Sequence, residues 1–133
     1  ALTSGRVHDD ARIIIPRGAT SPMEGGSLQG LGYALFEEPT LSRRLGIVMN
    51  PTMQDYKIPT MMDVPTIDVS FIAGSDANAN HTGARGIAEP AIIPTAPAIA
   101  AAVADAIGTE VLEIPLTPWR VLSAIAAIAS ATV

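Results

Sequence analysis

The sequence predicts an α+β fold, in which strands and helices follow one another without a regular crossover pattern. Two segments are typical of strands: an isoleucine run at 12–16, and an alternating apolar and polar segment at 67–72. A glycine-rich segment at 22–38 and two Ala- and Ile-rich segments near the C-terminus indicate helices. With 133 residues, 48% of them apolar and 16% charged, the chain has the composition of one globular domain.

The N-terminal half is expected to form a strand and then a helix. Residues 12–16, RIIIP, are typical of a buried strand that a proline ends. The capping box at 21–24, SPME, has serine at the N-cap and proline as the first helical residue, so a helix should begin there and end before Pro39. Gly26 and Gly30 share one face of that helix, which indicates close approach of another backbone or of a ligand.

The rest of the chain is expected to add three strands and two helices. Residues 45–49 and 111–114 predict short strands, and 67–72 predicts a strand with one face buried. Helices are expected at 98–107, which a glycine follows, and at 118–129, where a threonine N-cap precedes a proline. The last helix is apolar on nearly all faces, and the mean hydropathy is +0.34. Further protein should therefore cover this chain, and residues 1–133 form a single, incomplete domain.

Charge and composition argue against several functions. The net charge of -5 leaves no basic stripe for phosphates, so no nucleic-acid partner is expected. The absence of cysteine removes thiolate metal sites and thiol nucleophiles. His8 and His81 lie far apart in sequence, and Asp9 and Asp10 beside His8 are expected to be solvated charges near a terminus. No metal held by protein side chains is therefore expected.

No membrane span is expected either. The longest uncharged run, 90–104, contains three prolines and is shorter than the roughly 20 residues that cross a bilayer. The first residues, ALTSGRVHDD, are polar and lack the apolar core of a signal peptide. The location is expected to be the cytoplasm or the periplasm, with the cytoplasm preferred.

The segment GARGIAEP, residues 83–90, places one glutamate, Glu89, behind a run of small residues. In one interpretation Glu89 is a solvated glutamate at a helix start, which the helix dipole favours. In the other it is a general base with little water around it, and its pKa is open to tuning. The backbone N–H groups of Arg85 and Gly86 could likewise hold an anionic cofactor or belong to an ordinary turn. The residues alone favour the helix-start glutamate.

Five segments, in this order, resemble the molybdopterin-binding subunit of the xanthine dehydrogenase and aldehyde oxidase family. They lie at 18–38 (GATSPMEGGSLQGLGYALFEE), 50–65 (NPTMQDYKIPTMMDVP), 67–72 (IDVSFI), 83–90 (GARGIAEP) and 114–118 (IPLTP). The resemblance covers nearly the whole chain. It implies that the chain is the C-terminal portion of a subunit several times longer.

The resemblance also implies a function. Glu89 would be the general base that takes the proton from a Mo–OH group, so that an aldehyde or N-heterocycle is oxidised with water as the oxygen source. The metal would be held by the dithiolene of molybdopterin, itself or as its cytosine dinucleotide, and not by protein side chains. Two backbone segments would contact this cofactor: Gly18, Ala19, Thr20 and Ser21, and Arg85, Gly86, Ile87 and Ala88.

Further partners follow from the same resemblance. They are the rest of the molybdenum subunit and the domains or subunits that carry iron–sulfur clusters and FAD. The isolated chain is expected to be inactive, because one portion cannot enclose the pterin. A competing hypothesis is a non-catalytic α/β assembly module whose apolar helices dock a larger partner.

Overall fold

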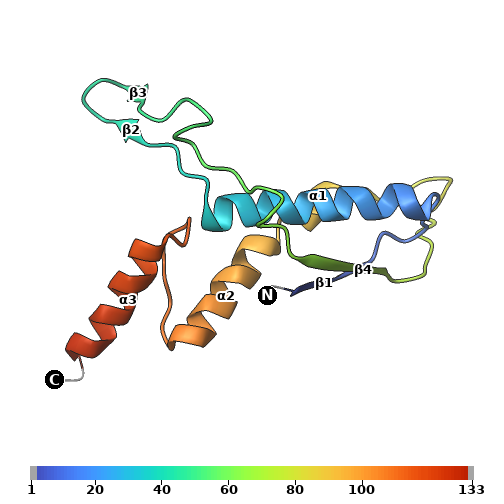
Figure 1. The fold of residues 1–133 in the computed structure, drawn as a ribbon. Coiled ribbons are helices and arrows are strands. Elements are labelled where there is room, and N and C mark those ends of the chain that lie inside the picture. The colour runs from blue at the N-terminus through green and yellow to red at the C-terminus, as the bar shows by residue number, and fades with distance from the viewer. Residues whose placement is uncertain (1–2, 132–133) are drawn as a thin grey trace.

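The computed structural model describes residues 3–131, with one long helix beside a two-stranded sheet (Figure 1). The helix, α1, spans Pro16–Leu35. The sheet pairs β1, Thr3–His8, with β4, Thr66–Phe71, in parallel along their full lengths. Helices and strands of this kind agree with the predicted α+β class.

The remaining elements follow α1 along the chain. Figure 1 shows a small hairpin projecting beyond the C-terminal end of α1, and a last helix lying apart from both α1 and the sheet. These elements are the hairpin strands β2 (Leu41–Ser42) and β3 (Ile47–Val48), the 3-10 helix η1 (Glu89–Ala91), and the helices α2 (Thr95–Ile107) and α3 (Pro118–Ala131).

Helix α1 begins earlier than the sequence predicts. Pro16 is its first residue, and Pro22 lies inside the helix although its nitrogen cannot donate the usual backbone hydrogen bond. Ala19 and Met23, on either side of Pro22, are 6% and 0% exposed. Their packing holds the turn before Pro22 in helical form, so the capping box at 21–24 is not the helix start.

The first strand is β1, and the strand predicted at 12–16 is wrong. Residues 12–15 form bends and irregular backbone, and Ile14 and Ile15 are 65% and 67% exposed. No neighbouring strand within residues 3–131 pairs with them, and Pro16 directs the chain into α1. β1 escaped prediction because its six residues hold little apolar patterning, and its partner β4 is distant in sequence.

Of the three other predicted strands, one is confirmed, one is shorter and one is wrong. In β4, Ile67, Val69 and Phe71 are half-buried and alternate with exposed residues, as the sequence predicts. At 45–49 only Ile47–Val48 is a strand, paired antiparallel with β2. Residues 111–114 contain no strand; they form an irregular link between α2 and α3.

The glycine face of α1 receives another backbone, as the sequence predicts. A Cβ atom added at Gly26 would lie 2.8 Å from the Ala91 Cβ and 3.2 Å from the Ala88 carbonyl oxygen. One added at Gly30 would overlap the Thr95 Cβ. The two glycines therefore allow η1 and the start of α2 to pack directly on α1.

Helix α2 extends the predicted helix at 98–107 by one turn, and Gly108 ends it with a left-handed φ of 75°. The stretch Glu89–Ile107 has the length and the mean hydropathy, 1.5, of a membrane span. Its first residues nevertheless form η1, and α2 itself has 13 residues, against the roughly 20 that cross a bilayer. Thr95 and Ala96 are buried where α2 meets α1.

Helix α3 is attached to the rest of the chain at its start. The Thr117 hydroxyl accepts the Arg120 backbone N–H at 3.3 Å, which confirms the predicted cap. Arg120 binds Glu38 at 2.7 Å, and the Leu116 backbone N–H donates to the Ala34 carbonyl at 2.7 Å. Beyond these anchors the helix exposes large apolar side chains: Trp119 (76%), Leu122 (59%), Ile125 (42%) and Ile128 (37%).

Candidate functional site

Both segments that the sequence assigns to a cofactor contribute residues to the lining of one cavity of about 320 Å³. Gly18 and Ala19 come from the first turn of α1, and Arg85 and Ile87 come from the GARGIAEP segment. The sequence separates these pairs by more than half of the chain, and the fold brings them together. The other lining residues are Asp10, Arg12, Ile13, Ile14, Ile15 and Ala84.

The start of GARGIAEP is fixed to the segment that follows β1. Gly83 has a left-handed φ of 69°, and a Cβ atom there would overlap the Ser75 Oγ, so only glycine fits without rearrangement. Ala84 forms an isolated antiparallel bridge with Ala11. The Arg12 backbone N–H donates to the Gly83 carbonyl at 3.1 Å. These contacts therefore fix the backbone of Gly83 and Ala84, which leads into the cavity.

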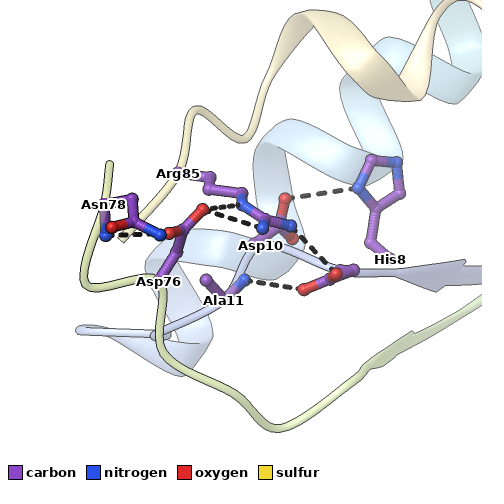
Figure 2. Close-up of polar contacts among 7 residues, drawn as sticks. His8, Asp10, Ala11, Asp76, Asn78 and Arg85 are labelled. Atoms are coloured by element: carbon purple, nitrogen blue, oxygen red, sulfur yellow. Dashed lines mark hydrogen bonds and ion pairs between the residues drawn. The ribbon is translucent and has the colours of Figure 1, made fainter. Parts of the chain in front are cut away.

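The side chain of Arg85 completes this attachment, as Figure 2 shows. It donates to Asp76 through Nε at 2.9 Å and Nη2 at 2.8 Å, and to Asp9 through Nη1 at 2.9 Å. The hydrogen bonds from Arg85, aided by a backbone N–H from Asn78, hold the pKa of Asp76 below its ordinary value. The bond to Asp76 and the charge of Asp9 raise the pKa of Arg85. Arg85 thus clamps the segment in place.

Glu89 is the first residue of η1, directly after the clamped segment. Its side chain is exposed, and within residues 3–131 it makes no hydrogen bond or ion pair. The expected scarcity of water around Glu89 is therefore not found in the described part of the chain. The position of its backbone is set by the packing of η1 on Gly26 of α1.

The remaining predicted cofactor residues lie beside the cavity and do not line it. The Thr20 hydroxyl donates to the Pro16 carbonyl at 3.2 Å, and Ser21 is exposed on α1. Gly86 and Ala88 are exposed. The backbone N–H groups of Gly86 and Ile87 have no acceptor among residues 3–131, so they are available to a ligand or to water.

Asp10 is a site residue that the sequence analysis assigned to solvated charge. It is 2% exposed and lines the cavity, and its Oδ1 lies 3.2 Å from His8 Nδ1, from which it accepts a hydrogen bond when Nδ1 carries the proton. The sequence signal was a second carboxylate directly after a histidine at the end of a strand, but β1 was not predicted. In the described part of the chain no three His, Asp or Glu side chains could together hold a metal ion.

Comparison with known proteins shows the family of the chain. Residues 3–65 match the family model of a molybdopterin cofactor-binding domain. The xanthine dehydrogenase molybdenum-binding subunit of Escherichia coli O157:H7 is 40% identical over 114 residues, which are 86% of this chain and 15% of the relative. The aldehyde oxidoreductase molybdenum-binding subunit of Escherichia coli strain K12 is 34% identical over 84% of this chain and 15% of the relative.

The chain belongs to the xanthine dehydrogenase and aldehyde oxidase family. A solved relative, quinoline 2-oxidoreductase from Pseudomonas putida 86, superposes with a TM-score of 0.85 at 29% identity, over 93% of this chain and 16% of that one. A Cu,Mo-CO dehydrogenase shares the fold, with a TM-score of 0.83 at 20% identity. This member of the family spans about 15% of the length of the curated relatives that it matches.

The residues around the cavity fit the pterin cofactor of this family. The two backbone N–H groups at Gly86 and Ile87 point to an acceptor-bearing ligand, and a run of three isoleucines supplies apolar surface. These donors and the apolar wall together suit the polar edge and the flat face of a heterocycle.

Proposed function

We propose that this chain supplies the general base and part of the cofactor pocket of a molybdenum hydroxylase that oxidises aldehydes or N-heterocycles with water as the oxygen source. Membership of the family supports the reaction class. The observation that carries the assignment to this site is the cavity lined by Gly18, Ala19, Arg85 and Ile87, with Glu89 two residues after Ile87 in the chain. Residues 18–21 and 85–88 would hold the pterin.

Glu89 would act as the base because nothing in the described chain occupies its carboxylate. A general base must be within hydrogen-bond reach of the proton that it accepts and must not be tied up in another interaction. The clamp at Arg85 and the contact of η1 with Gly26 hold the Glu89 backbone, so the carboxylate would not need to be ordered at each turnover. When bound, the molybdenum cofactor supplies the oxygen transfer and the acceptance of electrons.

The parts that this chain lacks would come from the rest of the assembly. The remainder of the subunit would cover Glu89 and exclude water, and partner domains or subunits with iron–sulfur clusters and FAD would carry the electrons away. The cofactor would be molybdopterin or its cytosine dinucleotide. We place the assembly in the cytoplasm, and we expect the isolated chain to be inactive.

The experiment that tests the role of Glu89 uses the complete subunit with its partners. Glu89→Gln should lower the turnover number by about 10²- to 10⁴-fold, the usual contribution of a general base. Molybdenum and pterin contents should stay at the wild-type level, because the substitution leaves the clamp and the cavity intact. Glu110→Gln, an exposed glutamate away from the cavity, is the matched control and should keep full activity. Full turnover in the Glu89→Gln enzyme would remove the base assignment.

A second candidate function is a non-catalytic assembly module. The exposed apolar side chains of α3 and of Met61 and Met62, which are 88% and 93% exposed, favour a role in docking. This function predicts a native complex that contains neither molybdenum nor pterin. Elemental and pterin analysis of the purified complex separates the two proposals.

A further inference from the structure

We propose that Arg6 forms an ion pair with an aspartate or glutamate from the part of the subunit outside this chain, in a cavity that this outside part fills. The cavity has a volume of about 400 Å³, and residues of β1, β4, α1 and α2 line it. Its lining shares no residue with the cavity assigned to the pterin. The inference therefore goes beyond the proposed function and does not depend on the role of Glu89.

Arg6 places a positive charge in an apolar cavity. It is the one charged side chain among the described residues that line the cavity, whose walls are mostly apolar side chains such as Leu31, Ile67, Ile99 and Val103. A charge moved from water into such surroundings is costly unless an opposite charge and hydrogen bonds compensate it. An anion is therefore expected beside Arg6.

The hydrogen bonds of the Arg6 guanidinium are incomplete. Nη2 donates to the Thr95 hydroxyl oxygen at 2.9 Å. Nε is buried and Nη1 is not fully buried, and neither has an acceptor among residues 3–131. Because Arg6 is only half-buried and lines the cavity, a group that enters the cavity can reach the guanidinium at Nη1. No carboxylate within residues 3–131 pairs with it.

Two other arginines show what Arg6 lacks. Arg85 and Arg120 each bind two carboxylates, and the hydrogen bonds to Asp76 and to Glu38 are the main causes that raise the pKa of these two arginines. Burial instead lowers the pKa of Arg6, and no acid within residues 3–131 offsets this effect. The guanidinium nevertheless stays charged at neutral pH. An added carboxylate would give Arg6 the environment that the other two arginines already have.

The occupant that the structure favours is a segment of the same subunit. This chain spans about 15% of the length of its relatives, so a subunit of that length would hold most of its residues outside it. Ala98 and Ala102 of α2 line the cavity and are exposed, so the α2 side of the cavity is open to a covering segment. An apolar segment that carries one carboxylate would cover these walls and neutralise Arg6.

The test uses Arg6→Lys in the complete subunit with its partners. The substitution keeps a positive charge and supplies an amine, which a water-soluble carbodiimide joins by an amide bond to a carboxylate in direct contact, while the carbodiimide takes up the water released. After digestion, mass spectrometry should find position 6 joined to an aspartate or glutamate outside residues 1–133. Arg120→Lys is the matched control for the chemistry, because Glu38 lies 2.7 Å from Arg120 and should become joined to position 120.

Each alternative occupant gives a different product. No joined peptide at position 6, while the control reacts, would overturn the inference. So would a link from position 6 to a second copy of the subunit, to a carboxylate within residues 1–133, or to a small acid. None of these products depends on turnover or on pterin content, so a failure here leaves the role of Glu89 untouched.

A second measurement is hydrogen exchange in the complete subunit. Arg6→Met keeps a side chain of similar length but removes the charge, which leaves the partner carboxylate buried without a cation. We expect the amides of α2 to exchange at least about tenfold faster than in wild type, because loss of one member of a buried ion pair is strongly destabilising. Arg6→Lys should restore slow exchange. Arg44→Met, which replaces an exposed arginine in the turn between β2 and β3, should have no effect. Wild-type exchange of α2 in Arg6→Met would contradict the ion pair.

Discussion

At the scale of single residues, the site depends on a few side chains and backbone angles that neighbouring segments impose. Gly83 has a left-handed backbone and has no room for a Cβ atom. Ala11, which bridges to the next residue, Ala84, also has a positive φ of 56° although it carries a Cβ. A left-handed conformation costs a non-glycine residue roughly 1–2 kcal/mol. The chain accepts this cost where β1 turns toward the cavity.

Ala11→Gly should therefore stabilise the chain. The substitution removes the left-handed strain, while the greater freedom of glycine in the unfolded chain and the loss of the methyl group of Ala11, which is 3% exposed, offset most of the gain. We expect a net increase of up to about 0.5 kcal/mol in the free energy of unfolding, measured by urea denaturation of the isolated chain. Ala79→Gly, in an exposed turn without positive φ, should be neutral or destabilising. Equal effects of the two substitutions would contradict the strain argument.

The ion pairs of Arg85 predict a dependence of stability on pH. The folded chain lowers the pKa of Asp76, so the clamp contributes stability above the ordinary pKa of an aspartate and loses it as the pH falls through the lowered value. The melting temperature of the wild type should fall on acidification below about pH 4. Asp76→Asn should have a lower melting temperature at neutral pH and a shallower fall. Parallel curves for the two proteins would show that the clamp does not contribute.

At the scale of elements, the small residues of α1 decide how the cavity is assembled. Gly26 and Gly30 bring η1 and α2 within contact distance of the helix backbone, and η1 carries Glu89. Gly25, adjacent in sequence, faces open space. Close packing therefore requires glycine at positions 26 and 30, whereas position 25 has room for a side chain.

Gly30→Ala and Gly25→Ala form a matched pair. The Cβ of Gly30→Ala would overlap Thr95, so we expect a loss of about 1–3 kcal/mol in the free energy of unfolding and a displaced α2. Gly25→Ala adds helix propensity without a clash and should gain up to about 1 kcal/mol. Circular dichroism during thermal unfolding of the isolated chain measures both. A stabilising Gly30→Ala would refute the packing of α2 on α1.

At the scale of the whole molecule, the described chain leaves much apolar surface uncovered. Its parallel sheet has two strands, whereas parallel sheets are normally covered on both faces. Helix α3 is anchored through Arg120 and Leu116 and otherwise exposes Trp119 and Leu122. These features agree with a chain that spans about 15% of its relatives' length.

Hydrogen exchange should report this incompleteness. In the isolated chain we expect fast exchange of the amides of α3 and slow exchange in the middle of α1, where Met23 and Leu31 are buried. In the complete subunit, α3 should become protected while α1 changes little. Mass spectrometry of peptides from the two forms measures this difference. Equal exchange of α3 in both forms would show that the rest of the subunit does not cover it.

The sequence by itself determined the local features of this protein. The glycine face of α1, the alternation in β4, the Gly108 helix end and the Thr117 cap depend on short-range patterns that the structure confirms. The ordered motifs also determined the family. What the local patterns missed was β1, whose pairing partner is about sixty residues away, and the extension of α1 back to Pro16.

Only the tertiary structure decided the composition of the candidate site. It brought Gly18 and Ala19 together with Arg85 and Ile87 around one cavity, buried Asp10 against it, and joined Arg85 to Asp9 and Asp76. It also left Glu89 exposed, where the small neighbouring residues had predicted little water. The physical reason is that burial and ion pairing depend on segments distant in the chain, whereas helix caps and strand alternation depend on adjacent residues.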